Sequence, residues 1–292
     1  MEWYQEIRGE HYRKFKEKHA VYFTNPSTEA LAPFRIADGL YYVGDRMVCV
    51  HLLETTEGLI LIDAGFPCAT HLLIDAIWRL GFDPKDVRWI LLTHGHFDHY
   101  GAANEFRRLY GTKTALSAVD AAALREFPAR GHGFAAHTEY IEEPVIDREL
   151  ADGEVFSFGG RDIRCVLTPG HTMGVMTFFF DVTDNGNTYL AGLFGGAGPS
   201  HMTLAAMKFD RYPLDMPQRM LASLDRIEKE PVTVHLGNHP GNNKTLQKRE
   251  QQLKEGGNPF IDPGSWNRQL SALREKTLSI IRENAETAKR YE

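Results

Sequence analysis

The sequence predicts a single α+β domain, and three observations support this. Patterns typical of strands and of helices recur in both halves of the chain. No linker rich in Pro, Gly or Ser separates the two halves. The chain has 292 residues, which is enough to bury one large core. We therefore expect one domain over residues 1–292, with a partly helical lead-in at 1–30 and a C-terminal helix at 264–292.

The order of the elements follows from the spacing of apolar residues and from the turn residues between them. Strands are expected at 40–43, 47–53, 59–63, 89–92, 113–116, 154–158, 162–167, 176–181, 188–191 and 232–236. Helices are expected at 69–80, 102–110, 119–127, 216–229 and 243–254, and from 266 to the end. The run Asp184-Asn185-Gly186-Asn187 predicts a hairpin. Residues 128–150 show no regular pattern, and we interpret them as an irregular segment that is a candidate for a mobile flap.

Composition limits the classes of function. The formal net charge is −6, from 33 Lys and Arg against 39 Asp and Glu, which disfavours nucleic-acid binding. No run is apolar over about 18 residues, so we expect no membrane partner. The start lacks the apolar core of a secretory signal, which predicts a cytoplasmic protein, or a secreted one if a leader was removed. Cys49, Cys68 and Cys165 are scattered and odd in number, so free buried thiols are expected.

A cluster of potential metal ligands directly follows the apolar run 89–92. Within six residues it holds His94, His96, Asp98 and His99. Two histidines two residues apart can share one ion, and Asp98 with His99 can turn toward a second. Carboxylate and imidazole without thiolate suit zinc, and they tolerate iron or manganese. The alternative, a polar surface loop with coincidental histidines, is disfavoured by four ligand-type residues at this spacing.

Two distant histidines repeat the placement of the cluster on a turn after a strand. His171 lies in Thr168-Pro169-Gly170-His171-Thr172, after the strand that ends at 167. His239 lies in Leu236-Gly237-Asn238-His239-Pro240, after the strand that ends near 236. A lone histidine on a glycine turn is normally a surface residue, but this repeated placement predicts further metal ligands. His235 competes for the last role, although its position within a strand favours packing.

The motif His94-X-His96-X-Asp98-His99, with His171 and His239, resembles that of the metallo-β-lactamase superfamily. The further likeness is to the third subclass of class B zinc β-lactamases, and it covers most of the chain. The segments that carry it are 32–38, 62–65, 152–154, 168–171 and 258–263. The resemblance implies a four-layer αββα sandwich with two metal ions at one edge.

The resemblance also implies roles for individual residues. His94, His96 and His171 would hold the first zinc ion, and Asp98, His99 and His239 the second. Asp63 would orient ligands from the end of its strand, and a purely turn-stabilising role for it is compatible with that. The implied activity is a dinuclear zinc hydrolase that opens a cyclic amide of β-lactam type by attack of metal-bound hydroxide. His94, His96 and Asp98 would carry the catalysis, Asp98 holding the hydroxide in line, and antibiotic resistance would be one consequence.

Two positions depart from the usual superfamily pattern. Most of its hydrolases carry an aspartate that bridges both metals, and here the residue is Leu193. Its absence is the pattern of the third subclass and counts against lactonases, glyoxalases and phosphodiesterases. The two ions would then carry a net charge of about +2 rather than about +1, which favours anionic small-molecule substrates and predicts looser binding of the second zinc. Gly195 stands where a serine usually helps to hold the substrate carboxylate. The glycine run 195–198, with Ser200 nearby, either offers N–H donors there or is a plain loop.

Other interpretations remain open. A lactonase or another hydrolase of a cytoplasmic metabolite is the main alternative, and a catalytically silent metal-binding relative is another. An iron-dependent reductase is less compatible with the cluster, because such proteins typically have Glu in place of its second histidine. Aromatic residues near the motifs are candidate pocket walls, with core packing the favoured role for each: Phe97, Tyr100, Phe134 and Phe194. The C-terminal helix is expected to pack through Leu270, Leu273, Leu278 and Ile281.

Overall fold

The computed structural model describes residues 2–126 and 142–291 of the chain. Seven strands form an N-terminal sheet in chain order: β1 (Phe34–Ala37), β2 (Leu40–Tyr42), β3 (His51–Thr55), β4 (Gly58–Ile62), β5 (Val87–Leu91), β6 (Lys113–Ser117) and β7 (Arg148–Leu150). Five strands form a C-terminal sheet in the order β12 (Val234–Leu236), β11 (Asn187–Phe194), β10 (Met176–Asp184), β9 (Arg161–Leu167) and β8 (Val155–Phe158). The first four strands pair antiparallel, and β4 to β7 pair parallel.

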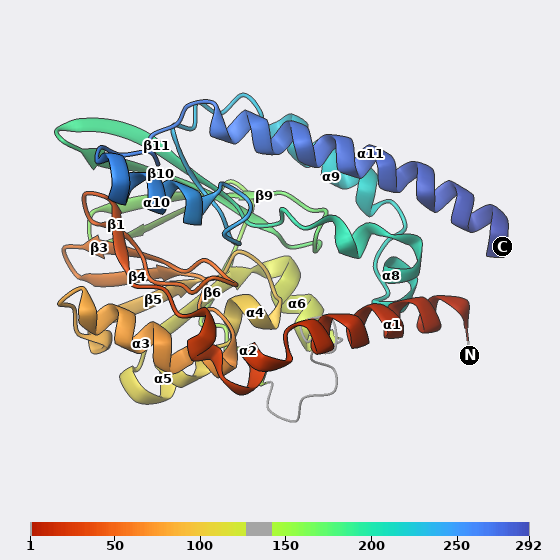
Figure 1. Cartoon of the computed structure of the whole chain (residues 1–292), viewed down its shortest axis with the longest axis horizontal. Coiled ribbons are helices and arrows are strands. Elements are labelled where there is room, and N and C mark those ends of the chain that lie inside the picture. Colours follow the sequence, from red (N-terminus) through yellow and green to blue (C-terminus); the bar gives the residue numbers. More distant parts are fainter. Residues whose placement is uncertain (1, 127–141, 292) are drawn as a thin grey trace.

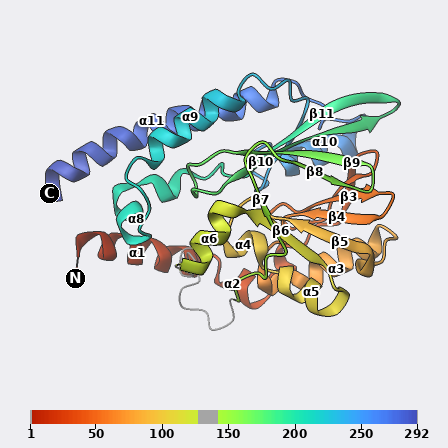
Figure 2. The same cartoon turned by 180° about the vertical axis from the view of Figure 1, so that it is seen from behind.

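The helices connect and cover these sheets. They are α1 (Trp3–Lys18), α2 (Ala20–Thr24), α3 (Thr70–Arg79), α4 (Phe97–Tyr100), α5 (Ala103–Tyr110), α6 (Ala118–Glu126), α8 (Leu204–Phe209), α9 (Met216–Ile227), α10 (Thr245–Glu255) and α11 (Ser265–Tyr291). Short 3-10 turns lie at η1 (Pro26–Glu29), η2 (Pro67–Ala69), η3 (Pro84–Asp86) and η5 (Pro199–Met202). Figures 1 and 2 show α3 and α5 on the outer face of the N-terminal sheet, and α9 and α11 on the outer face of the C-terminal sheet. The predicted αββα sandwich is therefore confirmed.

Three apolar clusters hold the layers together. One fills the space between the sheets, with side chains such as Ile62 from β4 and Phe178 from β10. A second joins the N-terminal sheet to α3 and α5, for example through Ile77 and Phe106. The third lies under α9 and α11, where Trp266 is almost fully buried. Burial of these side chains is the main favourable contribution to folding and fixes both sheets relative to one another.

Most expected elements are present, with shifted ends. The hairpin between β10 and β11 has positive φ at Asn185 and Gly186, as a two-residue turn of this sequence requires. The expected strand 47–53 is only partly right, because β3 begins at His51 and the preceding residues form a loop. The prediction of an irregular segment at 128–150 is wrong at its C-terminal end, because β7 forms there and pairs with β6. Residues 127–141, which include most of the candidate flap, lie outside the described residues.

The C-terminal helix packs on the sandwich, but not through all the expected residues. Leu270 and Leu273 are buried, whereas Leu278 is 41% exposed. Thr277 and Ile280 take the inward positions instead, because helical spacing from Leu273 reaches them rather than Leu278. Among the described residues, no helix combines the length and apolar character needed to cross a membrane.

Candidate metal centre

The sandwich brings several strand ends to one edge. Because β4 and β5 are parallel, Asp63 after β4 and His94 after β5 emerge side by side. The C-terminal sheet contributes His171 after β9 and His239 after β12. The ligand cluster itself is partly helical, since α4 begins at Phe97 directly after His96. The fold thus delivers all of the predicted ligand residues to one place.

His94, His96 and His171 form the first set, and their ring nitrogens converge. Nδ1 of His96 lies 3.0 Å from Nε2 of His94 and 3.0 Å from Nε2 of His171. All three side chains are buried. Burial and the neighbouring imidazoles hold the pKa values of His94 and His96 well below their ordinary values, and burial lowers the pKa of His171 to about 4. These rings are therefore neutral near pH 7, as metal ligation requires.

Asp98, His99 and His239 form the second set. Oδ2 of Asp98 lies 3.4 Å from Nε2 of His99 and 3.6 Å from Nε2 of His239. This set is more open, because the side chain of His239 is 38% exposed and that of Asp98 is 18% exposed. In each set, the candidate ligand atoms lie within 4.8 Å of one another. The two sets are those the sequence predicts, although their role as metal ligands stays a prediction.

The remaining ring nitrogens fix which way the lone pairs point. Nδ1 of His171 donates to the carbonyl of Gly198 at 2.6 Å, and Nδ1 of His239 donates to the carbonyl of Met47 at 2.9 Å. Because a carbonyl can only accept, the proton of each ring is on Nδ1 and the lone pair is on Nε2. The lone pairs of both residues therefore face the centre of their set.

His94 and His99 are fixed in the same way through Asp63. Nδ1 of His99 donates to Oδ2 of Asp63 at 2.8 Å. The hydroxyl of Thr93 donates to the same carboxylate at 2.9 Å and therefore accepts from Nδ1 of His94 at 3.0 Å. Asp63 is 1% exposed and also accepts the backbone N–H of Thr93 at 2.8 Å. The predicted orienting role of Asp63 is thus supported by its three hydrogen bonds, which reach one ligand residue in each set.

A divalent cation fits this arrangement. A single proton on Nδ1 of His96 can satisfy only one of its two 3.0 Å contacts, whereas a cation among the three nitrogens satisfies all of their lone pairs. The buried Nε2 of His99 has no hydrogen-bond partner among the described residues, and it faces Asp98. Imidazole nitrogens with a carboxylate oxygen are ligands that zinc prefers. The outward hydrogen bonds to Asp63 and to carbonyls are the type of support that orients metal-bound histidines.

Asp120 is a site residue that sequence reasoning missed. It lies in α6 and accepts hydrogen bonds from the N–H of Gly95 at 2.8 Å, from the hydroxyl of Thr172 at 2.7 Å and from the N–H of Gly174 at 2.8 Å. It thereby ties the loop of His94 and His96 to the loop of His171. No motif marks an acidic residue within a helical pattern, so only the tertiary structure shows this role.

A buried network beside the first set was also missed. The ring of His201 lies 4.7 Å from that of His96 and 4.9 Å from that of His171, measured between centroids. Arg8 of α1 donates to Nδ1 of His201 at 2.9 Å and to Asp210 at 2.9 Å. In the sequence, His201 lies 193 residues and Asp210 lies 202 residues from Arg8. No local pattern in the sequence indicates contacts over such separations.

The two departures from the usual pattern have structural reasons. Leu193 is 1% exposed and belongs to the core between the sheets. At Gly195 a Cβ atom would lie 2.5 Å from the carbonyl of Met176 and 2.6 Å from Cβ of Thr93, so this backbone leaves no room for serine. Gly198 lies against the ring of His171 and accepts its hydrogen bond. The glycine run therefore packs closely behind the candidate ligands rather than forming a loose loop.

Three of the four candidate pocket walls prove to be core residues. Phe97 and Tyr100 belong to the cluster under the N-terminal sheet, and Phe194 belongs to the cluster under α11. Phe134 lies outside the described residues. His235, the competitor for the last ligand role, is fully buried, packs edge-on against Trp266 and belongs to neither set.

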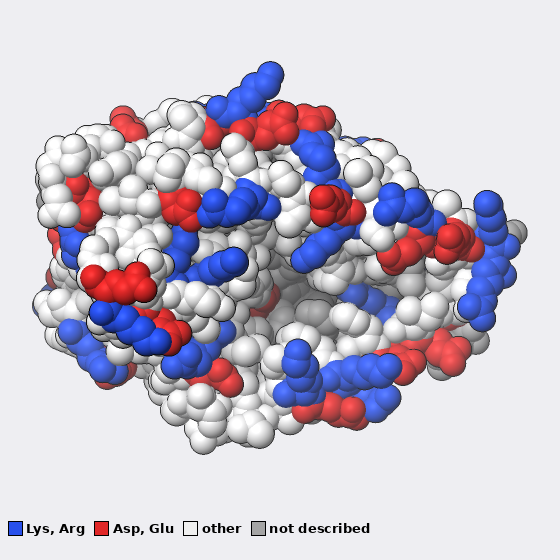
Figure 3. All heavy atoms as spheres, turned by 45° about the horizontal axis from the view of Figure 1, so that its top comes forward, with Lys and Arg blue, Asp and Glu red and all other residues white. Residues whose placement is uncertain are grey.

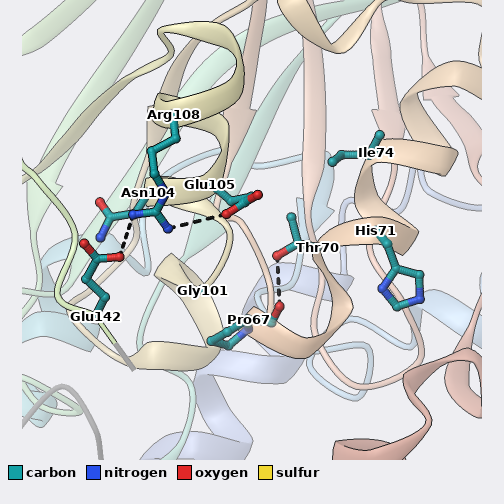
Figure 4. A pocket seen from close by; sticks show the side chains of 9 residues that line it. All are labelled: Pro67, Thr70, His71, Ile74, Gly101, Asn104, Glu105, Arg108 and Glu142. Atoms are coloured by element: carbon teal, nitrogen blue, oxygen red, sulfur yellow. Dashed lines mark hydrogen bonds and ion pairs between the residues drawn. The ribbon is translucent and has the colours of Figure 1, made fainter. Parts of the chain in front are cut away.

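The surface carries hollows of different character. Figure 3 shows a face that is hollowed near its middle, with Lys, Arg, Asp and Glu side chains around the hollow. A separate cavity of about 390 Å³ lies between η2, α3 and α5 (Figure 4). Its one arginine, Arg108, pairs with both carboxylates of the lining, Glu142 at 2.7 Å and Glu105 at 3.4 Å.

Comparisons with known proteins agree with the fold. A model of the metallo-beta-lactamase superfamily matches residues 43–184. The fold is similar to BJP-1, a subclass B3 metallo-beta-lactamase of Bradyrhizobium japonicum, with a TM-score of 0.80 and 25% identity over 89% of this chain and 97% of that one. Residues 43–184 thus match the metallo-β-lactamase superfamily, and the whole chain has the metallo-β-lactamase fold. The native FEZ-1 metallo-beta-lactamase from Legionella gormanii gives a TM-score of 0.79, with 26% identity over 88% of this chain and 98% of that one.

Curated superfamily relatives have several activities in their names. An N-acyl homoserine lactonase of Bacillus thuringiensis is 25% identical over 49% of this chain and 62% of its own length. A probable polyketide biosynthesis zinc-dependent hydrolase of Bacillus velezensis is 30% identical over 58% of this chain and 64% of its own length. A hydroxyacylglutathione hydrolase of Acidiphilium cryptum is 35% identical over 32% of this chain and 30% of its own length. The chain thus spans less than two thirds of each of these relatives.

Proposed function

We propose that the protein is a dinuclear zinc hydrolase that opens a cyclic amide of β-lactam type. The observation that carries the proposal is the pair of adjacent candidate ligand sets, in each of which the ligand atoms lie within 4.8 Å of one another and one histidine, His171 or His239, points its lone pair inward. His94, His96 and His171 would hold one ion, and Asp98, His99 and His239 the other. The similarity to subclass B3 metallo-beta-lactamases over nearly nine tenths of the chain supports the substrate class.

The side chains of this centre are arranged for hydrolysis. Zinc bound there would supply a Lewis acid and a water whose pKa is lowered toward ~7. Asp98 presents its Oδ2 between His99 and His239, where it can accept a proton from a bound water and hold that water in line. Asp63 and the carbonyls of Gly198 and Met47 keep the ligand rings in place, so little reorganisation is needed during the reaction.

Position 193 supports the choice of substrate. Leucine adds no negative charge to the centre, so two zinc ions would remain more electropositive than with a shared carboxylate. Such a centre favours substrates that carry a carboxylate beside the amide, as β-lactams do. Gly195 lacks the serine hydroxyl that usually helps to bind that carboxylate, so its recognition must rest on other donors.

A lactonase or a related ester hydrolase is the second candidate. Its support is the naming of the relatives, which include N-acyl homoserine lactonases and a hydroxyacylglutathione hydrolase. The same centre suits an ester, because the oxyanion that develops on attack is similar to that of an amide. Only the leaving group differs, an alkoxide or thiolate instead of an amine.

Metal analysis followed by a substrate panel tests the proposal. We expect about two zinc ions per chain and turnover of a chromogenic cephalosporin, with kcat/KM lowered about 10³-fold or more in His96→Ala. The matched control is His71→Ala, which removes an exposed histidine of α3 and should leave both values unchanged.

The panel also separates the candidates. Turnover of lactones or thioesters without turnover of any β-lactam would replace the first proposal by the second. Zinc binding without turnover of any panel member would contradict both and would indicate a silent metal-binding relative.

A further inference from the structure

A second cavity adjoins the candidate metal centre. It has a volume of about 300 Å³ and lies between α10, α11 and the two loops that carry Ala197 and Asn242. Ala197 precedes Gly198, which accepts the hydrogen bond of His171. Asn242 accepts the backbone N–H of His239 at 2.8 Å. One residue of the cavity wall, Asn242, therefore also holds His239, and another, Ala197, directly precedes the residue that holds His171.

The cavity is lined by more positive than negative charge. Its basic side chains come from both helices and from the residue that directly precedes α10: Lys244, Lys248, Arg268 and Lys276. Asp262 is its one acidic side chain. The whole chain carries a net charge of −6, so this local excess of cations runs against the overall charge. An excess of cations around a concave surface is the electrostatic signature of an anion site.

The carboxylate of Asp262 already interacts with two of the four cations. Asp262 pairs with Arg268, and its Oδ2 lies 3.8 Å from Nζ of Lys248. Among the described residues, neither Lys244 nor Lys276 pairs with a carboxylate. At least two cations at the cavity thus have no carboxylate partner in the described part of the chain.

Lys248 is the buried member of this group. It is only 7% exposed, and its ammonium group makes one long hydrogen bond to Oγ of Ser265, at 3.4 Å. Burial lowers its pKa, and the nearby Arg268 and Lys244 lower it further, while Asp262 opposes them. Burying an ammonium group with such weak pairing costs free energy, and a bound anion beside it would offset that cost.

The end of α11 adds to the positive potential. This 27-residue helix begins at Ser265, which lines the cavity. The N-terminus of a long helix carries a partial positive charge and unsatisfied N–H groups. Arg268 and Gln269, in the first turn of the same helix, also line the cavity. Positive side chains and a helix end therefore converge on one space.

We propose that this cavity binds a phosphate group. A dianion suits a site where four cations face one carboxylate, and phosphate offers enough oxygens for several ammonium and guanidinium donors at once. The group is either a free inorganic anion or the phosphorylated end of a molecule whose reactive bond reaches the metal centre. Binding of the free anion does not depend on the proposed hydrolase reaction, whereas the second source rests on it.

Phosphate binding is measured directly on the zinc-loaded, full-length protein. We expect saturable binding of inorganic phosphate in a ³¹P NMR or calorimetric titration, weakened about tenfold or more in Lys248→Met. The matched control is Lys254→Met, which removes an exposed lysine of the same helix that pairs with Glu250 outside the cavity. Absence of saturable binding in the wild-type protein would overturn the proposal.

Two further variants separate the alternatives. Because Lys248→Met changes a buried residue, the double variant Lys244→Gln/Lys276→Gln tests the same site through exposed side chains and is expected to weaken binding several-fold. His96→Ala tests whether phosphate binds the zinc ions instead. We expect it to retain phosphate binding; loss of binding in His96→Ala but not in Lys248→Met would overturn the proposal.

The source of the phosphate is distinguished by competition. A pair of acyl esters that differ only by a phosphate on one end is compared with inorganic phosphate. If the group belongs to a substrate, Lys248→Met raises KM for the phosphorylated ester only, and inorganic phosphate competes with that ester. If the group is a free ion, phosphate still binds and the variant leaves the ratio of kcat/KM values for the two esters unchanged. Both results require the cavity to bind phosphate, as the titration tests independently.

Discussion

The two candidate ligand sets of the proposed metal centre differ in how firmly the chain holds them. His94, His96 and His171 are buried, and their nitrogens meet at 3.0 Å. In the other set, the side chain of His239 is 38% exposed, and the closest approaches to Asp98 are 3.4 and 3.6 Å. The first set is compact and shielded from water, whereas the second is wider and open on one side.

This difference indicates that the two sets have different roles. A buried set of three neutral rings is prepared to bind one ion with little rearrangement, and water has little access to displace it. An open set leaves room for a water and a substrate group beside the ion. With Leu193 in the core, no side chain at that position joins the two sets. We therefore expect the second ion to bind more weakly and to exchange more readily.

Among variants that leave every candidate ligand in place, the largest change we expect comes from Asp63→Asn. The asparagine amide tolerates the positive φ of 62° at this position, so the backbone is preserved. It replaces one carboxylate oxygen by an NH₂ group, which cannot accept from His99 and Thr93. We expect zinc affinity of the second set and kcat/KM to fall about 10–100-fold, as is typical when a histidine ligand loses its carboxylate partner.

A two-site zinc titration measures this effect, with Asp75→Asn as the matched control. Asp75 is exposed on α3 and makes only a long ion pair, 3.6 Å from Arg79. The first set should lose less affinity, because Nδ1 of His94 bonds to Thr93 rather than directly to Asp63. Equal losses at both sets would contradict the proposed difference between them.

A substitution at position 195 tests how closely the glycine run 195–198 packs behind the first set. Gly195→Ser would place Cβ within 2.6 Å of Cβ of Thr93, the residue that orients His94. We expect the free energy of unfolding to fall by about 1–3 kcal/mol, because overpacked sites relax only at such a cost. Gly9→Ser is the control, since a Cβ atom there has no neighbour within 4 Å. An unchanged melting temperature would show that the backbone around position 195 accommodates the serine without strain.

The sequence was sufficient to predict the candidate ligands because of where they occur. His94 to His99 are consecutive, and His171 and His239 each follow a strand on a glycine turn, so local patterns reveal them. The fold was predictable for a related reason, since apolar periodicity marks most strands and helices. Ends of elements were less predictable, as with β3, because hydrogen-bond registers depend on neighbouring strands.

The supporting residues were not predictable in this way. Asp120, in a helix, accepts hydrogen bonds from two loops. Arg8 donates a hydrogen bond to His201, which lies 193 residues away in the sequence. Such contacts depend on how layers pack, and a polar residue in a helical pattern looks like any solvated position. Lys248 is a further case, because its burial arises only where α10 meets α11.

Acidification compares the two sets most directly. Histidine ligands must be unprotonated to bind a metal, so a ligand with a raised pKa loses its ion at a higher pH. Although burial alone would lower it, Asp98 and Asp63 raise the pKa of His99. Burial and nearby rings lower the pKa values in the first set, to about 4 for His171. As the pH falls from 8 toward 5, zinc content measured after dialysis should thus drop from two ions per chain toward one before it drops to zero. Release of both ions in one step would mean that the sets are coupled, and that the difference in exposure does not govern their affinity.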